Sequence, residues 1–200
     1  MPILLYENPV SGNCYKVRLL LTLLGVEFER REVSVVDRSG REKVLGGLSP
    51  SLNVPTVVLE DGRPLGESNA ILWYFAEGTE YLPDDSYERA QVLQWMFFEQ
   101  YKHEPAIAVV RYWLSILGEV PGDADIEARR EAGHAALAAM ERHLADHEYF
   151  VGGRFTIADI ALYAYTHVAP EGGFDLGPYP AVRGWLERVA AEPGMFAIGD

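Results

Sequence analysis

The sequence has few cysteines, few basic residues and no long apolar run, and each shortage makes a class of protein unexpected. One cysteine in 200 residues cannot form an internal disulfide, which fits a reducing cytoplasm. The first apolar run, Ile3 to Tyr6, is far shorter than a signal peptide or a membrane-spanning helix needs. We therefore expect a cytoplasmic protein without a disulfide framework or a membrane partner.

Basic residues are outnumbered, with 17 Lys+Arg against 30 Asp+Glu and a net charge of −13. Residues 1–77 hold 8 Lys+Arg against 10 Asp+Glu, a net of −2, so residues 78–200 hold 9 against 20, a net of −11. Such an acidic half would repel nucleic acid, so no nucleic-acid partner is expected. The near-neutral half places Arg38, Arg41 and Lys43 together, which suits either an anionic small ligand or a solvated loop.

Apolar residues make up 48% of the chain, which is enough for a packed core. In the first part of the chain their spacing predicts alternating strands and helices. In residues 1–77, turn signals and apolar periodicity predict strands at 2–6, 28–36, 54–59 and 63–65, and helices at about 17–24 and 67–75. A further helix is expected before the third strand, without defined bounds. The order is typical of a small α/β layer with mixed strand directions.

After residue 77 the strand signals end. Residues 78–86 read as a linker, and four helices should follow: 86–117 with a bend at Pro105, 125–145, one that starts at Thr156, and 181–190. Thr156 and Asp159 form a capping box, so we expect a structural role for Asp159. The sequence thus predicts an α/β domain over 1–77, a linker over 78–86 and an all-helical domain over 87–200.

Four short stretches, in this order, carry a family resemblance: Ser11 to Arg18, Asn53 to Thr56, Glu67 to Ala70, and Thr156 to Asp159. With these spacings the whole chain resembles the cytosolic glutathione S-transferases, of a serine-type, bacterial-like kind. The resemblance implies a thioredoxin-like N-terminal domain and an all-α C-terminal domain. It also implies glutathione as co-substrate, no metal, a homodimer and a role in detoxification.

Ser11 and Cys14 have the spacing of a C-x-x-C redox motif whose first thiol has become a hydroxyl. A free thiol has a pKa of about 8.5, and a hydrogen bond to a charged acceptor contributes roughly 1.5–3 kcal/mol, so Ser11 at a helix end could lower a bound thiol by about one to two pKa units. Ser11 is therefore the expected catalytic residue. Cys14, which could instead be a buried packing residue, and Tyr6 on the first strand are the alternatives.

The resemblance implies where glutathione binds. The Val54-Pro55 bond should be cis and should present the Val54 backbone to the cysteinyl part of the ligand, although a trans proline could merely open an edge strand. Ser68 and Glu67, at a helix start, would bind the γ-glutamyl carboxylate and amino group, although Ser68 could equally be a simple cap. The remaining expected glutathione contacts are Asn13, Asn53 and Arg41, with Lys43 as an alternative to Arg41.

The electrophile is expected between the domains, beside the first helix of the second domain, at Tyr101, Tyr112 and the possible anchor Arg111. Most of the surrounding aromatic stripe should be core. His143 and His147 are spaced as H-x-x-x-H, but no acidic residue adjoins the first histidine and no third ligand is evident, so no metal site is expected.

Four functions fit these features. Conjugation of glutathione to an electrophilic small molecule is preferred. Glutathione-dependent isomerisation of a maleyl-type substrate and glutathione-linked disulfide reduction are the alternatives within the resemblance. A non-catalytic binding module is the alternative of another class.

Overall fold

The computed structural model describes residues 2–119 and 122–199, which form two units. The first is Met1–Glu77 with Pro193–Asp200, and the second is Gly78–Glu192. Residues 193–199, which we expected to belong with the helical domain, group with the first unit. The Tyr15 hydroxyl there donates a hydrogen bond of 2.8 Å to the Phe196 carbonyl, and the two rings meet edge to face.

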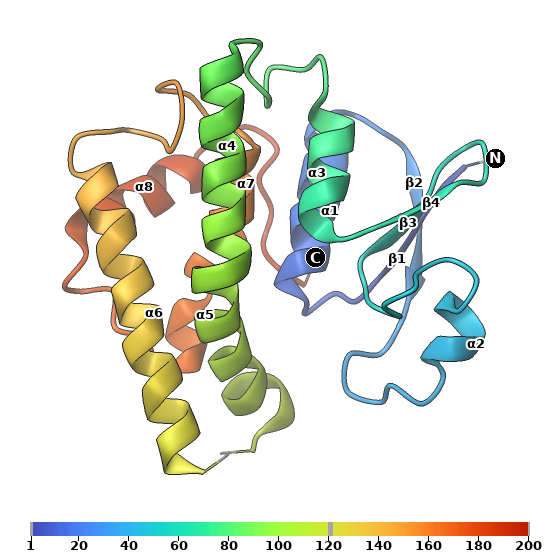
Figure 1. Cartoon of the computed structure of the whole chain (residues 1–200), viewed down its shortest axis with the longest axis horizontal. Coiled ribbons are helices and arrows are strands. Elements are labelled where there is room, and N and C mark those ends of the chain that lie inside the picture. Colours follow the sequence, from blue (N-terminus) through green and yellow to red (C-terminus); the bar gives the residue numbers. More distant parts are fainter. Residues whose placement is uncertain (1, 120–121, 200) are drawn as a thin grey trace. The chain divides into compact units, whose positions relative to one another are not determined.

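The first unit is built on a four-stranded mixed sheet with the strand order β2-β1-β3-β4. Its strands are β1 (Ile3–Glu7), β2 (Phe28–Glu32), β3 (Thr56–Val58) and β4 (Pro64–Gly66). β1 and β2 are parallel, whereas β1–β3 and β3–β4 are antiparallel. The helices are α1 (Gly12–Leu23), α2 (Arg41–Leu45) and α3 (Ser68–Ala76). α1 and α3 cover one side of the sheet, and α2 lies on the other (Figure 1).

The core of this unit lies between the sheet and the α1–α3 layer. Leu5 of β1 packs in one cluster with Leu21 of α1 and Ile71 of α3. Successive strand residues point to opposite faces of the sheet, so Leu5 and Glu7 lie on one face of β1 and Tyr6 lies on the other. The thioredoxin-like fold expected for this half is confirmed.

The second strand is shorter than its sequence suggests. We predicted residues 28–36, but β2 ends at Glu32. Two residues later the Ser34 hydroxyl accepts hydrogen bonds from the amides of Val36 and Asp37, which turns the chain out of the sheet direction.

The second unit is helical, as predicted. Its elements are α4 (Ser86–Phe98), the π-helical η1 (Glu99–His103), α5 (Glu104–Arg111), the π-helical η2 (Tyr112–Leu117), α6 (Asp123–Leu144), α7 (Ile157–Thr166), the 3-10 turn η3 (Ala169–Gly172) and α8 (Pro180–Ala190). The helix expected over 86–117 is present, and Pro105 follows the π-helical turn η1. Proline cannot donate to the carbonyl four residues back, and the wider turn before it accommodates that loss.

Helix α7 lies at the centre of the second unit, since all ten of its residues are buried. The capping box at its start is present. Asp159 Oδ2 accepts from the Thr156 amide at 2.9 Å, and its Oδ1 accepts from the Phe150 amide at 3.1 Å and Trp185 Nε1 at 3.0 Å. Asp159 is thus a structural residue, as expected. Within the described ranges, no helix is long and apolar enough to cross a bilayer.

Candidate functional site

Ser11 occupies the N-cap of α1, with the extended backbone that this position requires. Its Oγ accepts a hydrogen bond of 3.4 Å from the Cys14 amide, and its own amide donates to the Asn8 carbonyl at 3.1 Å. The side chain is half-buried. Because Oγ serves as an acceptor in the cap, its own hydrogen can be donated, either to the neighbouring Cys14 sulfur or to another group.

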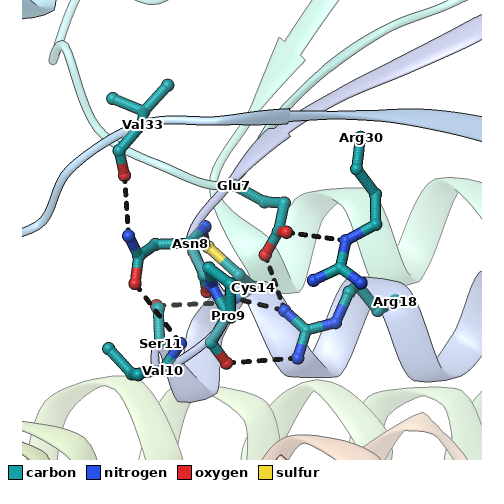
Figure 2. Close-up of polar contacts among 9 residues, drawn as sticks. All are labelled: Glu7, Asn8, Pro9, Val10, Ser11, Cys14, Arg18, Arg30 and Val33. Atoms are coloured by element: carbon teal, nitrogen blue, oxygen red, sulfur yellow. Dashed lines mark hydrogen bonds and ion pairs between the residues drawn. The ribbon is translucent and has the colours of Figure 1, made fainter. Parts of the chain in front are cut away.

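A buried ion pair holds the loop that carries Ser11 (Figure 2). Arg18 Nη1 lies 2.6 Å from Glu7 Oε2, and these side chains are 2% and 1% exposed. Arg18 Nη2 also donates to the Pro9 carbonyl at 3.2 Å, and Arg30 Nε meets Glu7 Oε1 at 2.8 Å. Sequence reasoning gave Glu7 and Arg18 no role. The available signal was an arginine inside the apolar run of α1.

Cys14 is enclosed by the same loop. Its side chain is fully buried, and its Sγ accepts from the Asn8 amide at 3.3 Å. Burial raises the pKa of the Cys14 thiol to about 12, although the hydrogen bonds from Ser11 and Asn8 favour the thiolate. The thiol is therefore protonated at neutral pH and lies out of reach of a ligand, which favours the packing role.

A second polar cluster joins the starts of α1 and α3. Lys16 is fully buried, and its Nζ lies 2.8 Å from Asn13 Oδ1 and 3.5 Å from Ser68 Oγ. The Ser68 hydroxyl donates to Asn13 Oδ1 at 3.2 Å. Two of the expected glutathione residues, Asn13 and Ser68, are thus in direct contact. Sequence reasoning assigned no role to Lys16.

Glu67 precedes α3 with φ 65° and ψ 114°, a conformation that costs a non-glycine residue energy. It is exposed, whereas Ser68 is buried. In the described part of the chain, the Glu67 side chain makes no capping bond to α3. The start of this helix therefore combines a residue with a strained backbone and an exposed carboxylate, Glu67, with the buried hydroxyl of Ser68, and the helix dipole favours an anion there.

The Val54-Pro55 bond is cis, as the resemblance implied. Asn53 beside it is exposed, and its Oδ1 accepts from Arg38 Nη2 at 3.0 Å. Arg41 is nearly buried, and its guanidinium donates to the carbonyls of Ser34 and Leu52 at 3.0 and 3.1 Å. These bonds connect the backbone near Ser34 to the backbone near Leu52, so Arg41 stabilises this loop.

In the same basic segment, Arg38 and Lys43 are exposed. Of the three basic residues, these two have the exposure that contact with a ligand carboxylate needs.

The three residues expected at the electrophile site differ in exposure and in their contacts within the second unit. Tyr101 is 76% exposed and lines a groove of about 790 Å³ between the α4–α5 segment and α6. Arg111 is instead nearly buried and pairs with Glu171 at 2.7 Å, while Tyr112 is half-buried in η2. Among the described residues, no group of three metal-binding side chains is found.

Two family models match the chain: the N-terminal domain of glutathione S-transferase over residues 10–77, and its C-terminal domain over residues 95–193. A glutathione S-transferase structure from Pseudomonas fluorescens is 43% identical, covers 100% of both chains and superposes with a TM-score of 0.95. One from Xanthobacter autotrophicus Py2 is 46% identical, with a TM-score of 0.93 over 98% of this chain and 96% of the other. The chain belongs to the glutathione S-transferase family.

Sequence comparison agrees: glutathione S-transferase 3 of Zea mays is 30% identical over 97% of this chain and 91% of the relative. The family and the enzyme class predicted above, a glutathione transferase, are thus confirmed. Relatives of similar distance carry other names. They include the disulfide-bond oxidoreductase YfcG of Escherichia coli K12, 29% identical over 94% of this chain and 90% of its own, and a probable maleylacetoacetate isomerase of Caenorhabditis elegans, 28% identical over 96% and 91%.

Proposed function

We propose that this glutathione transferase activates the thiol of bound glutathione through the Ser11 hydroxyl and directs it at an electrophilic small molecule. The observation that carries the proposal is the pairing of a half-buried hydroxyl at the start of α1 with a neighbouring thiol that is buried and protonated. Of these two groups only the hydroxyl can meet a ligand sulfur.

Binding would use three parts of the first unit. The ligand backbone would pair with Val54, as an added strand does at a sheet edge. The γ-glutamyl carboxylate would meet the amide and hydroxyl of Ser68 at the start of α3, and Glu67 would accept from the ligand's amino group. Asn13 and Asn53 are further proposed contacts. For the glycyl carboxylate we propose the basic segment, with exposed Lys43 better placed than Arg41.

In the chemical step, the thiol proton passes to solvent and the thiolate accepts a hydrogen bond from Ser11 Oγ. The sulfur lone pair then forms a C–S bond with the electrophilic carbon, and the leaving group departs with its bonding electrons. A charge-assisted hydrogen bond of roughly 1.5–3 kcal/mol corresponds to about one to two pKa units, enough to make much of the bound thiol a thiolate at neutral pH. We propose that Tyr101 contacts the electrophile, since it lines an open groove.

The test is a pH titration of thiolate absorbance for glutathione bound to the protein, with ligand-free protein subtracted. A midpoint about one to two pH units below that of free glutathione is expected. The Ser11→Ala variant should bind glutathione but lose this shift. A midpoint equal to that of free glutathione in the wild-type protein contradicts the proposal.

A disulfide-reducing function is the second candidate, because a relative of comparable identity is a disulfide-bond oxidoreductase. Since Cys14 is buried and protonated, such a reaction would use the thiols of two glutathione molecules and not a protein thiol. A rate of reduction of a small disulfide that is the same in the wild-type protein and in a Cys14→Ala variant would support it.

A homodimer, a cytoplasmic location and a part in detoxification are proposals that follow from the family. Light scattering that shows a monomer would overturn the proposed homodimer.

A further inference from the structure

Lys16 is fully buried within the first unit and touches both polar residues that the proposed glutathione site shares between α1 and α3. Its Nζ lies 2.8 Å from Asn13 Oδ1, one turn back on the same helix, and 3.5 Å from Ser68 Oγ, 52 residues away. Burying an ammonium group is expensive unless it is well hydrogen-bonded, so these contacts are a specific arrangement.

The hydrogen bonds of this cluster leave one hydroxyl able to change its acceptor. The Ser68 hydroxyl donates to Asn13 Oδ1 at 3.2 Å, and the same oxygen accepts from the Lys16 ammonium. If a ligand carboxylate arrives at the start of α3, the Ser68 hydroxyl can rotate to it while Lys16 keeps Asn13 Oδ1 satisfied. Without Lys16, Asn13 Oδ1 would lose both of these donors when the hydroxyl rotates.

The charge of Lys16 acts in the same direction. Because its Nζ lies 3.5 Å from Ser68 Oγ, any carboxylate that accepts from this hydroxyl lies within a few ångströms of a buried cation. Water screens such a pair much less than it screens a surface pair. The cluster therefore favours an anionic group over a neutral one at this point.

We propose that Lys16 is a positioning residue that makes the site select ligands with a carboxylate at the γ-glutamyl end. The inference rests on the proposed function, since it assigns a further residue to the same site. It concerns binding preference and is independent of which residue activates the thiol.

The experiment compares two ligands by calorimetry. One is glutathione, and the other is 4-aminobutyryl-cysteinylglycine, which lacks only the α-carboxylate of the γ-glutamyl residue. The quantity of interest is the ratio of their dissociation constants. It is measured in the wild-type protein, in Lys16→Met, in Lys16→Arg, and in a control, Arg63→Met, which removes a positive charge from a side chain that is 72% exposed and paired with Asp61.

The wild-type protein and Arg63→Met should bind glutathione more tightly than the analogue. In Lys16→Met, glutathione binding should weaken roughly tenfold to a hundredfold while analogue binding changes little, so the ratio approaches one. Lys16→Arg should restore part of the preference. A general loss of structure would weaken both ligands together and would not change the ratio.

Two results overturn the inference alone: a wild-type ratio of one, or a Lys16→Met ratio equal to that of the wild-type protein. Failure of the wild-type protein to bind either ligand would overturn the proposed function as well. If Lys16→Met does not fold by circular dichroism, Lys16→Gln answers the same question, because it removes the charge and keeps a side-chain amide that can donate to Asn13 Oδ1. A wild-type ratio in that variant would count against the inference, and a lost preference would support it.

Discussion

Replacing Arg18 with methionine should show how strongly the buried ion pair beneath the Ser11 loop stabilises the first unit. The Glu7 carboxylate would keep Arg30 but lose a partner 2.6 Å away in a site where both side chains are almost fully enclosed. Removing one member of such a pair lowers the free energy of unfolding by about 3–5 kcal/mol. Because Glu7 keeps its contact with Arg30, we expect the loss to be about 3 kcal/mol. For a chain of 200 residues that unfolds in one transition, this loss lowers the Tm by roughly 6–12 °C.

The matched control is Arg30→Met. Arg30 meets the same carboxylate, but its side chain is 40% exposed, so we expect a loss below about 1 kcal/mol. The double variant Glu7→Leu/Arg18→Met should lose less than the two single changes together, because it removes both buried charges. Urea unfolding followed by far-UV circular dichroism measures the wild-type protein, the single variants Arg18→Met, Glu7→Leu and Arg30→Met, and the double variant. Additive losses, or equal losses for the Arg18 and Arg30 variants, would refute the reasoning.

Three further predictions follow from single side chains. Ser11→Ala should lower kcat at least about tenfold with glutathione still bound, and unchanged turnover would remove Ser11 from the mechanism. Burial raises the pKa of Asp159 to about 6 from 3.8, so between these values the native carboxyl keeps a proton that the unfolded chain has released. The unfolding free energy should therefore fall by roughly 3 kcal/mol from this group as the pH rises from about 4 to about 6. Urea titrations of Asp159→Asn should lack that slope. Gly133→Ala should destabilise by about 1–3 kcal/mol, since a Cβ there would clash with the buried Phe174 ring. Gly184→Ala, a helical glycine with open space around it, should gain up to about 1 kcal/mol, and a thermal melt in which both variants move the same way would contradict the packing argument.

Local signals located most elements because their causes lie within a few residues. The capping box of α7 needs only Thr156 and Asp159, and the N-cap of α1 needs only Ser11 and the helix that follows. Apolar periodicity likewise identified the long helical stretch that contains Pro105. It did not identify the two π-helical turns, because these depend on how the helix accommodates the proline and its packing.

The site residues divide in the same way. Ser11, Asn13 and Ser68 belong to short recognisable stretches, so sequence was enough to name them as candidates. The contact between Lys16 and Ser68 depends on packing α1 against α3, and the full burial of Cys14 depends on how the first unit packs around α1. Burial and charge partners arise when segments far apart in the chain meet. That is why the single cysteine could be read in two ways from the sequence, and why its surroundings in the fold make it a packing residue with a protonated thiol.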